Sequence, residues 1–129
     1  MIDLRKIRKL SLFAILCALS PLLGTTACGG DSGDVTRIVL KARAPERGNW
    51  SPQEIHVERG RPVTIVVRNV DIATHSFYLP ELNLNTGPLQ PGQTKEVTFT
   101  PEFAGEYLFL CAVWCSDYHM YERGWLIVE

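Results

Sequence analysis

Two cysteines and a histidine stand at equal spacing in the last quarter of the chain. Cys111, Cys115 and His119 are separated by three residues each, and His75 lies earlier in the sequence. In a tight loop these side chains would converge on a small volume, and thiolate and imidazole suit copper or zinc better than magnesium or calcium. A Cys-x-x-x-Cys spacing is weak evidence alone, but together with the two histidines it indicates a metal site.

The alternative for Cys111 and Cys115 is a disulfide. Four residues of extended strand span about 13 Å, whereas a disulfide allows a Cα separation of only about 4.4–6.8 Å, so the bond would require a turn. A metal-binding loop also supplies such a turn. A disulfide leaves His75 and His119 without a purpose, so we favour the metal site.

The first 27 residues have the three parts of an export signal. A basic start is followed by an apolar run from Leu10 to Leu23, and small residues precede Cys28. The apolar run is too short and wrongly flanked for a stable membrane span. The segment from Gly24 to Cys28 resembles a bacterial lipobox, which implies cleavage before Cys28 and acylation of its thiol. The alternative is an ordinary cleaved signal peptide that leaves Cys28 as a spare thiol.

Cleavage at this position leaves 102 residues, enough for one small domain. We expect residues 28–34 to be a glycine-rich flexible tether and residues 35–129 to be the domain. The part after the leader has nine Lys and Arg against 13 Asp and Glu, a net charge of −4 that argues against nucleic acid as a partner. Cys17 would leave with the signal, and the lipobox resemblance implies that Cys28 carries lipid. Cys111 and Cys115 therefore remain as a pair that, in an oxidising periplasm, forms a disulfide or binds a metal.

Short segments of alternating hydrophobicity, separated by turn signals, predict an all-β domain. The strongest expected strand is 63–69, which is β-branched almost throughout. His75 opens another expected strand, and the cysteine loop joins the last two. His56 faces outward in its strand as a solvated residue. We expect an antiparallel Greek-key sandwich or barrel with strands at 36–42, 54–58, 63–69, 75–79, 94–100, 106–111 and 124–129.

Three motifs resemble a known family. They are Asp71-x-x-x-His75-Ser-Phe, the equally spaced Cys, Cys and His of residues 111–119, and Arg123-Gly124 before a terminal strand. They are similar to the binuclear copper (CuA) cupredoxin domain of nitrous oxide reductase and of cytochrome c oxidase subunit II. The resemblance runs from about residue 54 to residue 129, and residues 78–85 and 119–124 look closer to the reductase version.

The resemblance implies a cupredoxin-like fold and a site for two copper ions. Cys111 and Cys115 would each bridge both coppers. His75 and His119 would bind one copper each, and the backbone carbonyl of Val113 would be a weak axial ligand.

Two positions depart from the family pattern. The family places methionine three residues after the second histidine, where this chain has Glu122, and the tryptophan of the reductase pattern falls at Val113 whereas this chain has Trp114. Glu122 either ligates or abuts the copper, or points outward toward Arg123. We interpret Met120 as a packing residue.

These features predict a periplasmic electron carrier, lipid-anchored to a membrane through Cys28. It would not be an enzyme, because 102 residues cannot contain the catalytic domain of the reductase. The partner would be a redox protein, a cytochrome or a copper enzyme, that binds weakly beside the exposed edge of His119. The alternatives are a copper chaperone or sensor, and an accessory component resembling oxidase subunit II.

Overall fold

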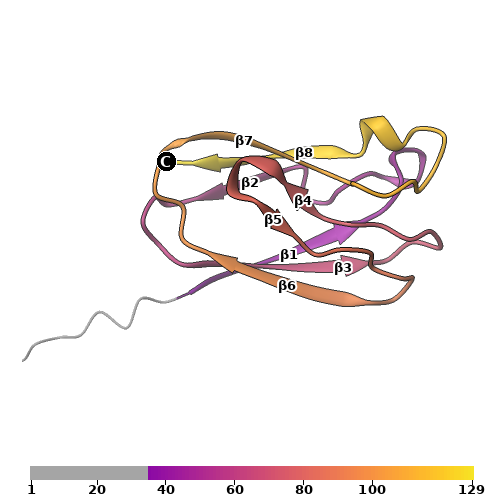
Figure 1. Ribbon diagram of the computed structural model, residues 1–129, viewed down its shortest axis with the longest axis horizontal. Helices are drawn as coiled ribbons and strands as arrows, with labels where there is room; N and C mark the ends of the chain where they lie inside the picture. The colour runs from indigo at the N-terminus through magenta and orange to yellow at the C-terminus, as the bar shows by residue number, and fades with distance from the viewer. Residues whose placement is uncertain (1–34) are drawn as a thin grey trace, which may run out of the picture. The chain divides into compact units, whose positions relative to one another are not determined.

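The computed structural model describes residues 35–129, which form two β-sheets packed face to face (Figure 1). The expected leader and tether, residues 1–34, lie outside the described residues. One sheet has the order β1-β3-β6 and the other has the order β2-β8-β7-β4-β5. The strands are β1 (Thr36–Ala42), β2 (Glu54–Val57), β3 (Val63–Asn69), β4 (Tyr78–Leu79), β5 (Leu84–Asn85), β6 (Thr94–Phe99), β7 (Gly105–Leu110) and β8 (Arg123–Val128).

Three short 3-10 helices, η2 (Pro45–Arg47), η3 (Pro80–Leu82) and η4 (His119–Tyr121), lie in the connections. The predicted all-β sandwich is confirmed. The expectation of wholly antiparallel pairing is wrong, because β1 pairs with β3 and β2 pairs with β8 in parallel. Parallel pairing is possible because β2 lies in the opposite sheet, so the chain leaves the first sheet after β1 and returns to it at β3.

The core lies between the sheets and is anchored by three aromatic rings. Trp50 packs edge-on against Phe77 and Phe109, with ring centroids 6.2 and 5.8 Å away, and Phe77 lies 5.5 Å from Phe109. Such pairs contribute about 0.5–1.5 kcal/mol each beyond the area they bury. Phe77 is two residues after His75 and Phe109 is two residues before Cys111. The same rings therefore fix the two segments that carry the candidate ligands.

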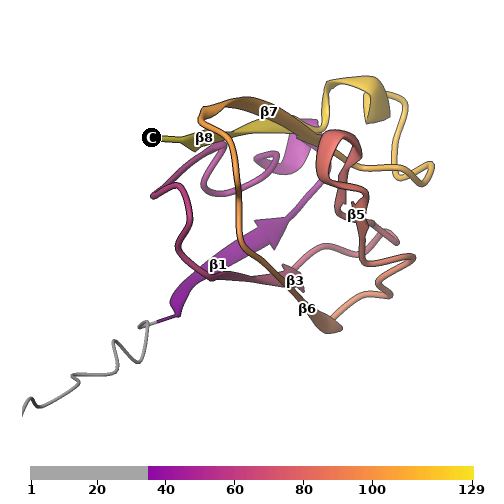
Figure 2. The same cartoon turned by 60° about the vertical axis from the view of Figure 1, so that its left-hand side comes forward.

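The cysteine loop joins the antiparallel strands β7 and β8 at the end of the sandwich opposite the C-terminus (Figure 1). The amide of Cys111 donates to the carbonyl of Glu122 at 3.1 Å, which closes the base of the loop. His75 lies outside regular strand, in an isolated bridge with Leu89. Two backbone hydrogen bonds between these residues, of 3.1 and 2.7 Å, hold His75 in place of the expected strand pairing. Figure 2 shows the loop projecting beyond the strands.

The approach of β8 to its neighbours requires glycine at position 124. A Cβ atom at Gly124 would clash with the carbonyl of Gln53 and with the ring of Phe109. The next residue, Trp125, donates its amide to the same Gln53 carbonyl at 2.7 Å. This close packing fixes the start of β8 and hence the position of Glu122.

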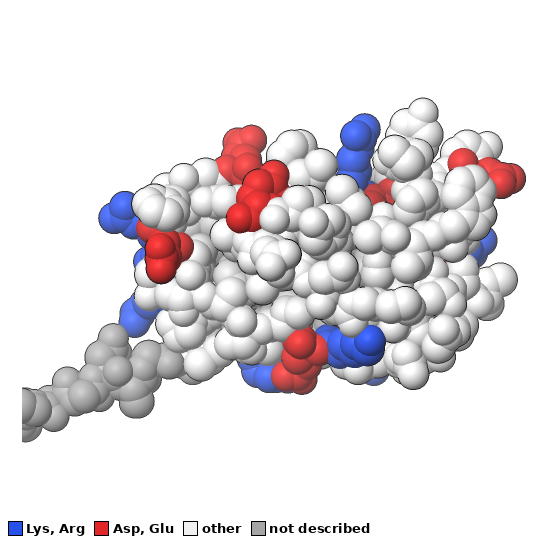
Figure 3. Space-filling view, viewed as in Figure 1, with Lys and Arg blue, Asp and Glu red and all other residues white. Residues whose placement is uncertain are grey.

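Among residues 35–129, no helix is long and apolar enough to cross a bilayer. The face drawn in Figure 3 carries charges of both signs, scattered mainly along its upper and lower rims. Much of the surface between them is uncharged, and neither sign forms an extended cluster on this face.

Candidate metal centre

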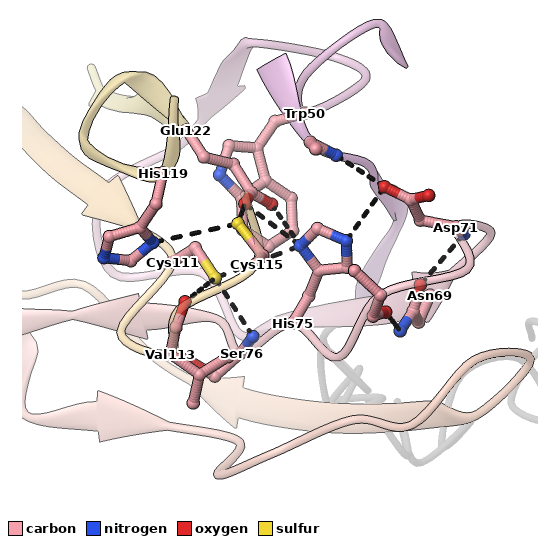
Figure 4. Close-up of polar contacts among 12 residues, drawn as sticks. Trp50, Asn69, Asp71, His75, Ser76, Cys111, Val113, Cys115, His119 and Glu122 are labelled. Atoms are coloured by element: carbon pink, nitrogen blue, oxygen red, sulfur yellow. Dashed lines mark hydrogen bonds and ion pairs between the residues drawn. The ribbon is translucent and has the colours of Figure 1, made fainter. Parts of the chain in front are cut away.

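Four side chains converge at the loop end of the sandwich. The ligand atoms of His75, Cys111, Cys115 and Glu122 lie within 4.8 Å of one another. All four residues are buried, with exposed fractions of 0%, 2%, 9% and 1%. Both cysteines are free thiols. Figure 4 shows the side chains pointing toward one another from the loop between β7 and β8 and from the segment before β4.

His75 is held by both ring nitrogens. Its Nδ1 lies 2.8 and 3.0 Å from the two carboxylate oxygens of Glu122 and 3.9 Å from Sγ of Cys111. Its Nε2 lies 3.1 Å from Oδ2 of Asp71. Asp71 in turn accepts from Nε of Arg47 at 2.6 Å and from the amide of Ala44 at 2.7 Å. This chain of contacts orients the ring so that Nδ1 faces the cluster, an arrangement typical of histidines that ligate metals.

The electrostatics of the cluster follow from burial and from the carboxylates. Burial alone lowers the pKa of His75, but hydrogen bonds to Cys111, Glu122 and Asp71 outweigh it and raise the pKa to about 10. Burial and the neighbouring Glu122 raise the pKa of the Cys115 thiol. Burial opposes ionisation of Asp71, yet the bond from Arg47 and two backbone amides hold its pKa well below the usual range. The raised pKa favours the protonated form of the His75 ring at neutral pH.

The two sulfur atoms have different neighbours. Sγ of Cys111 accepts from the amide of Ser76 at 3.4 Å and donates to the carbonyl of Val113 at 3.3 Å. Sγ of Cys115 donates to Oε2 of Glu122 at 2.8 Å. The amide of Ser76 and the carbonyl of Val113 therefore both contact Sγ of Cys111, whereas Sγ of Cys115 contacts a carboxylate.

His119 lies at the edge of the cluster, outside the four-residue group. It begins η4, is half-buried, and places Nδ1 3.7 Å from Sγ of Cys115. Its ring centroid is 5.9 Å from that of Trp114, whose side chain is 72% exposed. The two histidines therefore differ, because His75 is fully buried whereas His119 is only half-buried.

The structure brings all six predicted site residues to one end of the domain and corrects two alternatives. Glu122 does not point outward toward Arg123; it is 1% exposed and contacts His75 and Cys115. Met120 is not a packing residue, because its side chain is 76% exposed. One turn of η4 therefore turns Glu122 inward and Met120 outward, which spacing along the sequence does not specify.

Several supporting residues escaped sequence reasoning. The loop before β2 is hydrogen-bonded to the cysteine loop. Glu46 accepts from the hydroxyl of Ser116 at 3.1 Å, and Asn49 donates to the carbonyl of Tyr121 at 3.1 Å. Arg47 anchors Asp71 from the same loop. The only signal for Asp71 in the sequence is its position four residues before His75. Nothing in the sequence pointed to Arg47.

The residues fit copper. Two thiols and one or two imidazoles form a donor set of soft and borderline character, which suits copper. The donors are buried within one short loop and an adjacent segment, so few of them are exposed to competing water. The hard donors are the carbonyl oxygen of Val113 and the carboxylate of Glu122, which stands in the place of a thioether.

We expect copper uptake to release at least two protons per chain near pH 7. Ligands must be deprotonated to bind, and the pKa values of His75 and Cys115 are both raised above the ordinary values of these groups. Isothermal calorimetry in buffers of different ionisation enthalpy measures this number. A heat of binding that does not depend on the buffer would contradict it.

The chain belongs to the cupredoxin family, because the model of the cupredoxin-like domain matches residues 14–128. The fold and the His, Cys, Cys and Glu group define it as a cupredoxin-type copper-binding, electron-transfer domain. The chain is similar in sequence to nitrous-oxide reductase. It is 29% identical to the enzyme of Pseudomonas fluorescens over 100 residues, or 75% of this chain. It is 29% identical to the enzyme of Ralstonia nicotianae over 101 residues, or 76% of this chain. The matched region is 15% of each relative's length.

Solved structures show the same fold. A heme-copper terminal oxidase dimer aligns with a TM-score of 0.62 and 25% identity, over 73% of this chain and 65% of that chain. The periplasmic domain of cytochrome oxidase subunit II from Bradyrhizobium japonicum aligns with a TM-score of 0.63 and 17% identity, over 73% and 83% of the two chains. The predicted resemblance to reductase and oxidase domains is confirmed.

Proposed function

We propose that this chain is a one-electron carrier with a binuclear copper site. Cys111 and Cys115 would be shared between two copper ions, with His75 and His119 as the terminal ligands. The carbonyl of Val113 and the carboxylate of Glu122 would be weaker ligands or close neighbours. The observation that carries the proposal is the burial of two free thiols against His75 and Glu122, with His119 at their edge. The count of two ions comes from the resemblance of the ligand motifs to the binuclear copper domain of nitrous oxide reductase, and the chain is 29% identical to one such enzyme over 100 residues.

Bound copper would supply the redox chemistry, and the chain's own residues would keep the site rigid and dry. Arg47 and Asp71 fix the ring of His75, and the amide of Ser76 fixes Sγ of Cys111. The buried aromatic rings fix the segments that carry both residues. Ligands held this firmly change position little between oxidation states, which favours fast electron exchange.

Electrons would enter or leave at the half-buried histidine. We define the docking surface as Trp114 and Tyr118, whose side chains are 72% and 56% exposed beside His119. Exposed aromatic side chains beside a site mark a protein-binding surface. The partner would be a cytochrome or a copper enzyme, held weakly and briefly.

We expect Trp114→Ala to slow electron exchange with the partner by about tenfold, which corresponds to about 1.4 kcal/mol. Its bound copper should remain, because Trp114 touches the site only through its ring contact with His119. Phe103→Ala is the matched control, since Phe103 is also 72% exposed but lies between β6 and β7, at the other end of β7. Stopped-flow oxidation measures both. Equal slowing in the two variants, or none, would place electron entry elsewhere.

We also propose that the protein works in the bacterial periplasm, tethered to a membrane. The domain organisation would be a leader at residues 1–27, a tether at 28–34 and the cupredoxin domain at 35–129. The export signal and the lipobox-like segment before Cys28 support this, as does the likeness to a periplasmic oxidase domain.

Replacing Cys28 with Ser should move the protein from the membrane fraction to the soluble fraction. The reason is that acylation of the thiol would be the one strong link to the bilayer. Immunoblots of fractionated cells measure the distribution. A Cys28→Ser form that still fractionates with membranes as the parent does would refute the lipid anchor.

A copper chaperone would use the same thiols, and a role as an oxidase component would be the carrier function with a fixed partner. Carrier and chaperone differ in what happens to the metal. A carrier keeps its copper through repeated cycles of oxidation and reduction in the presence of a copper-free acceptor protein. Loss of the copper to the acceptor on reduction would favour the chaperone and overturn the proposal.

A further inference from the structure

A cavity of about 350 Å³ opens beside the candidate metal centre. Its inner wall includes Cys111 and Glu122, which are 2% and 1% exposed, and its outer wall includes Met120, which is 76% exposed. Leu108 and Leu110 of β7 make the wall apolar between them. The cavity therefore has the exposed Met120 and the buried Cys111 in the same lining.

Met120 leaves a large apolar side chain exposed to solvent at this position. A large apolar side chain with 76% exposure adds little to the core. The chain has two methionines, and the other is the initiator Met1, so Met120 is the sole thioether outside the leader. It directly follows the half-buried His119, and both residues line the cavity. An unbranched thioether is a flexible and soft ligand, and it prefers cuprous ion to harder metals.

We propose that Met120, with His119, is an entry site for cuprous ion on its way to Cys111. This inference rests on the proposed copper function and concerns a different step, the loading of the site. The ion would be held briefly by the thioether, then move through the cavity to the thiol. The copper–thioether bond breaks, a copper–thiolate bond forms, the thiol proton passes to the buffer, and copper stays cuprous throughout.

The positive charge of Arg123 at the same opening favours delivery of copper as a complex over binding of the free ion. Arg123 is exposed and also lines the cavity. Its positive charge repels a bare cation and attracts an anionic complex. Cuprous ion would therefore arrive on an anionic donor, and Met120 would be the first side chain of this protein to share it.

The test is the rate at which the reduced, copper-free protein takes cuprous ion from its bicinchoninate complex, followed by loss of the complex's colour. Met120→Leu keeps the size of the side chain and removes the sulfur. We expect its uptake to be at least tenfold slower, with the same final copper content and spectrum as the parent. Tyr121→Leu is the matched control, because Tyr121 is 61% exposed on the same η4 turn, and its rate should be unchanged.

Three other outcomes are possible in this experiment, and each would overturn a specific claim. Equal uptake rates for Met120→Leu and the parent would overturn the entry site and leave the copper function intact. A lower final copper content in Met120→Leu would show that Met120 is a resident ligand, which also overturns an entry role. A parent protein that takes up no copper would overturn the proposed function itself.

Discussion

Replacing either Cys111 or Cys115 with Ser should lower the affinity for copper by at least about a thousandfold, equivalent to about 4 kcal/mol. A hydroxyl is a poor substitute for a thiolate toward copper, and each sulfur would serve both ions of a bridged site. Loss of one cysteine should therefore abolish the bridged site and not simply halve the copper content. Equilibrium competition with a cuprous chelator measures the affinity.

The fold should survive these changes, since serine is nearly isosteric with cysteine. Ser116→Ala is the matched control in the same loop, because the Ser116 hydroxyl bonds only to Glu46 and to the amide of Tyr118. It should retain copper affinity close to that of the parent. If either Cys→Ser variant kept its parent's copper content and affinity while remaining folded, the thiols would not be the ligands.

Glu122→Met should raise the reduction potential of the copper-loaded protein by on the order of 100 mV. The buried carboxylate adds a negative charge that favours the more positive oxidised state, and unit charges about 4 Å apart interact by about 4 kcal/mol at an effective dielectric near 20. A difference of 59 mV in a one-electron couple corresponds to about 1.4 kcal/mol. Methionine would also favour the cuprous character of the reduced site.

Glu122→Gln separates the charge from the change of ligand, because it keeps an oxygen and the shape of the side chain. Its potential should rise as well, by less than that of Glu122→Met. Voltammetry on the parent and both variants gives the comparison. An unchanged potential and spectrum in Glu122→Met would place the carboxylate outside the influence of the metal, despite its burial beside His75 and Cys115.

The sequence was sufficient to predict the sandwich and most of its strands. β1 and β3 occupy the ranges expected for them, because β-branched and alternating residues carry their own signal of strand structure. Strand pairing did not follow from the same signal. Whether β2 joins β1 or β8 depends on contacts between residues far apart in the chain, so the two parallel pairs became visible only in three dimensions.

The candidate site shows a similar division. The types and spacing of Cys111, Cys115 and His119 pointed to a metal-binding loop, and His75 lies against them as expected. The direction of Glu122 could not be predicted, because it depends on the single turn of η4 and on the position of the His75 ring beside it. The role of the loop before β2 could not be predicted either, since its contacts with Asp71 and with the cysteine loop join residues that are far apart in the sequence.

The most direct test of a binuclear copper centre is copper analysis together with the electron spin resonance spectrum of the oxidised protein. We expect two copper ions per chain and a many-line hyperfine pattern from one unpaired electron shared over two copper nuclei. One copper per chain with the spectrum of a single nucleus would contradict the account.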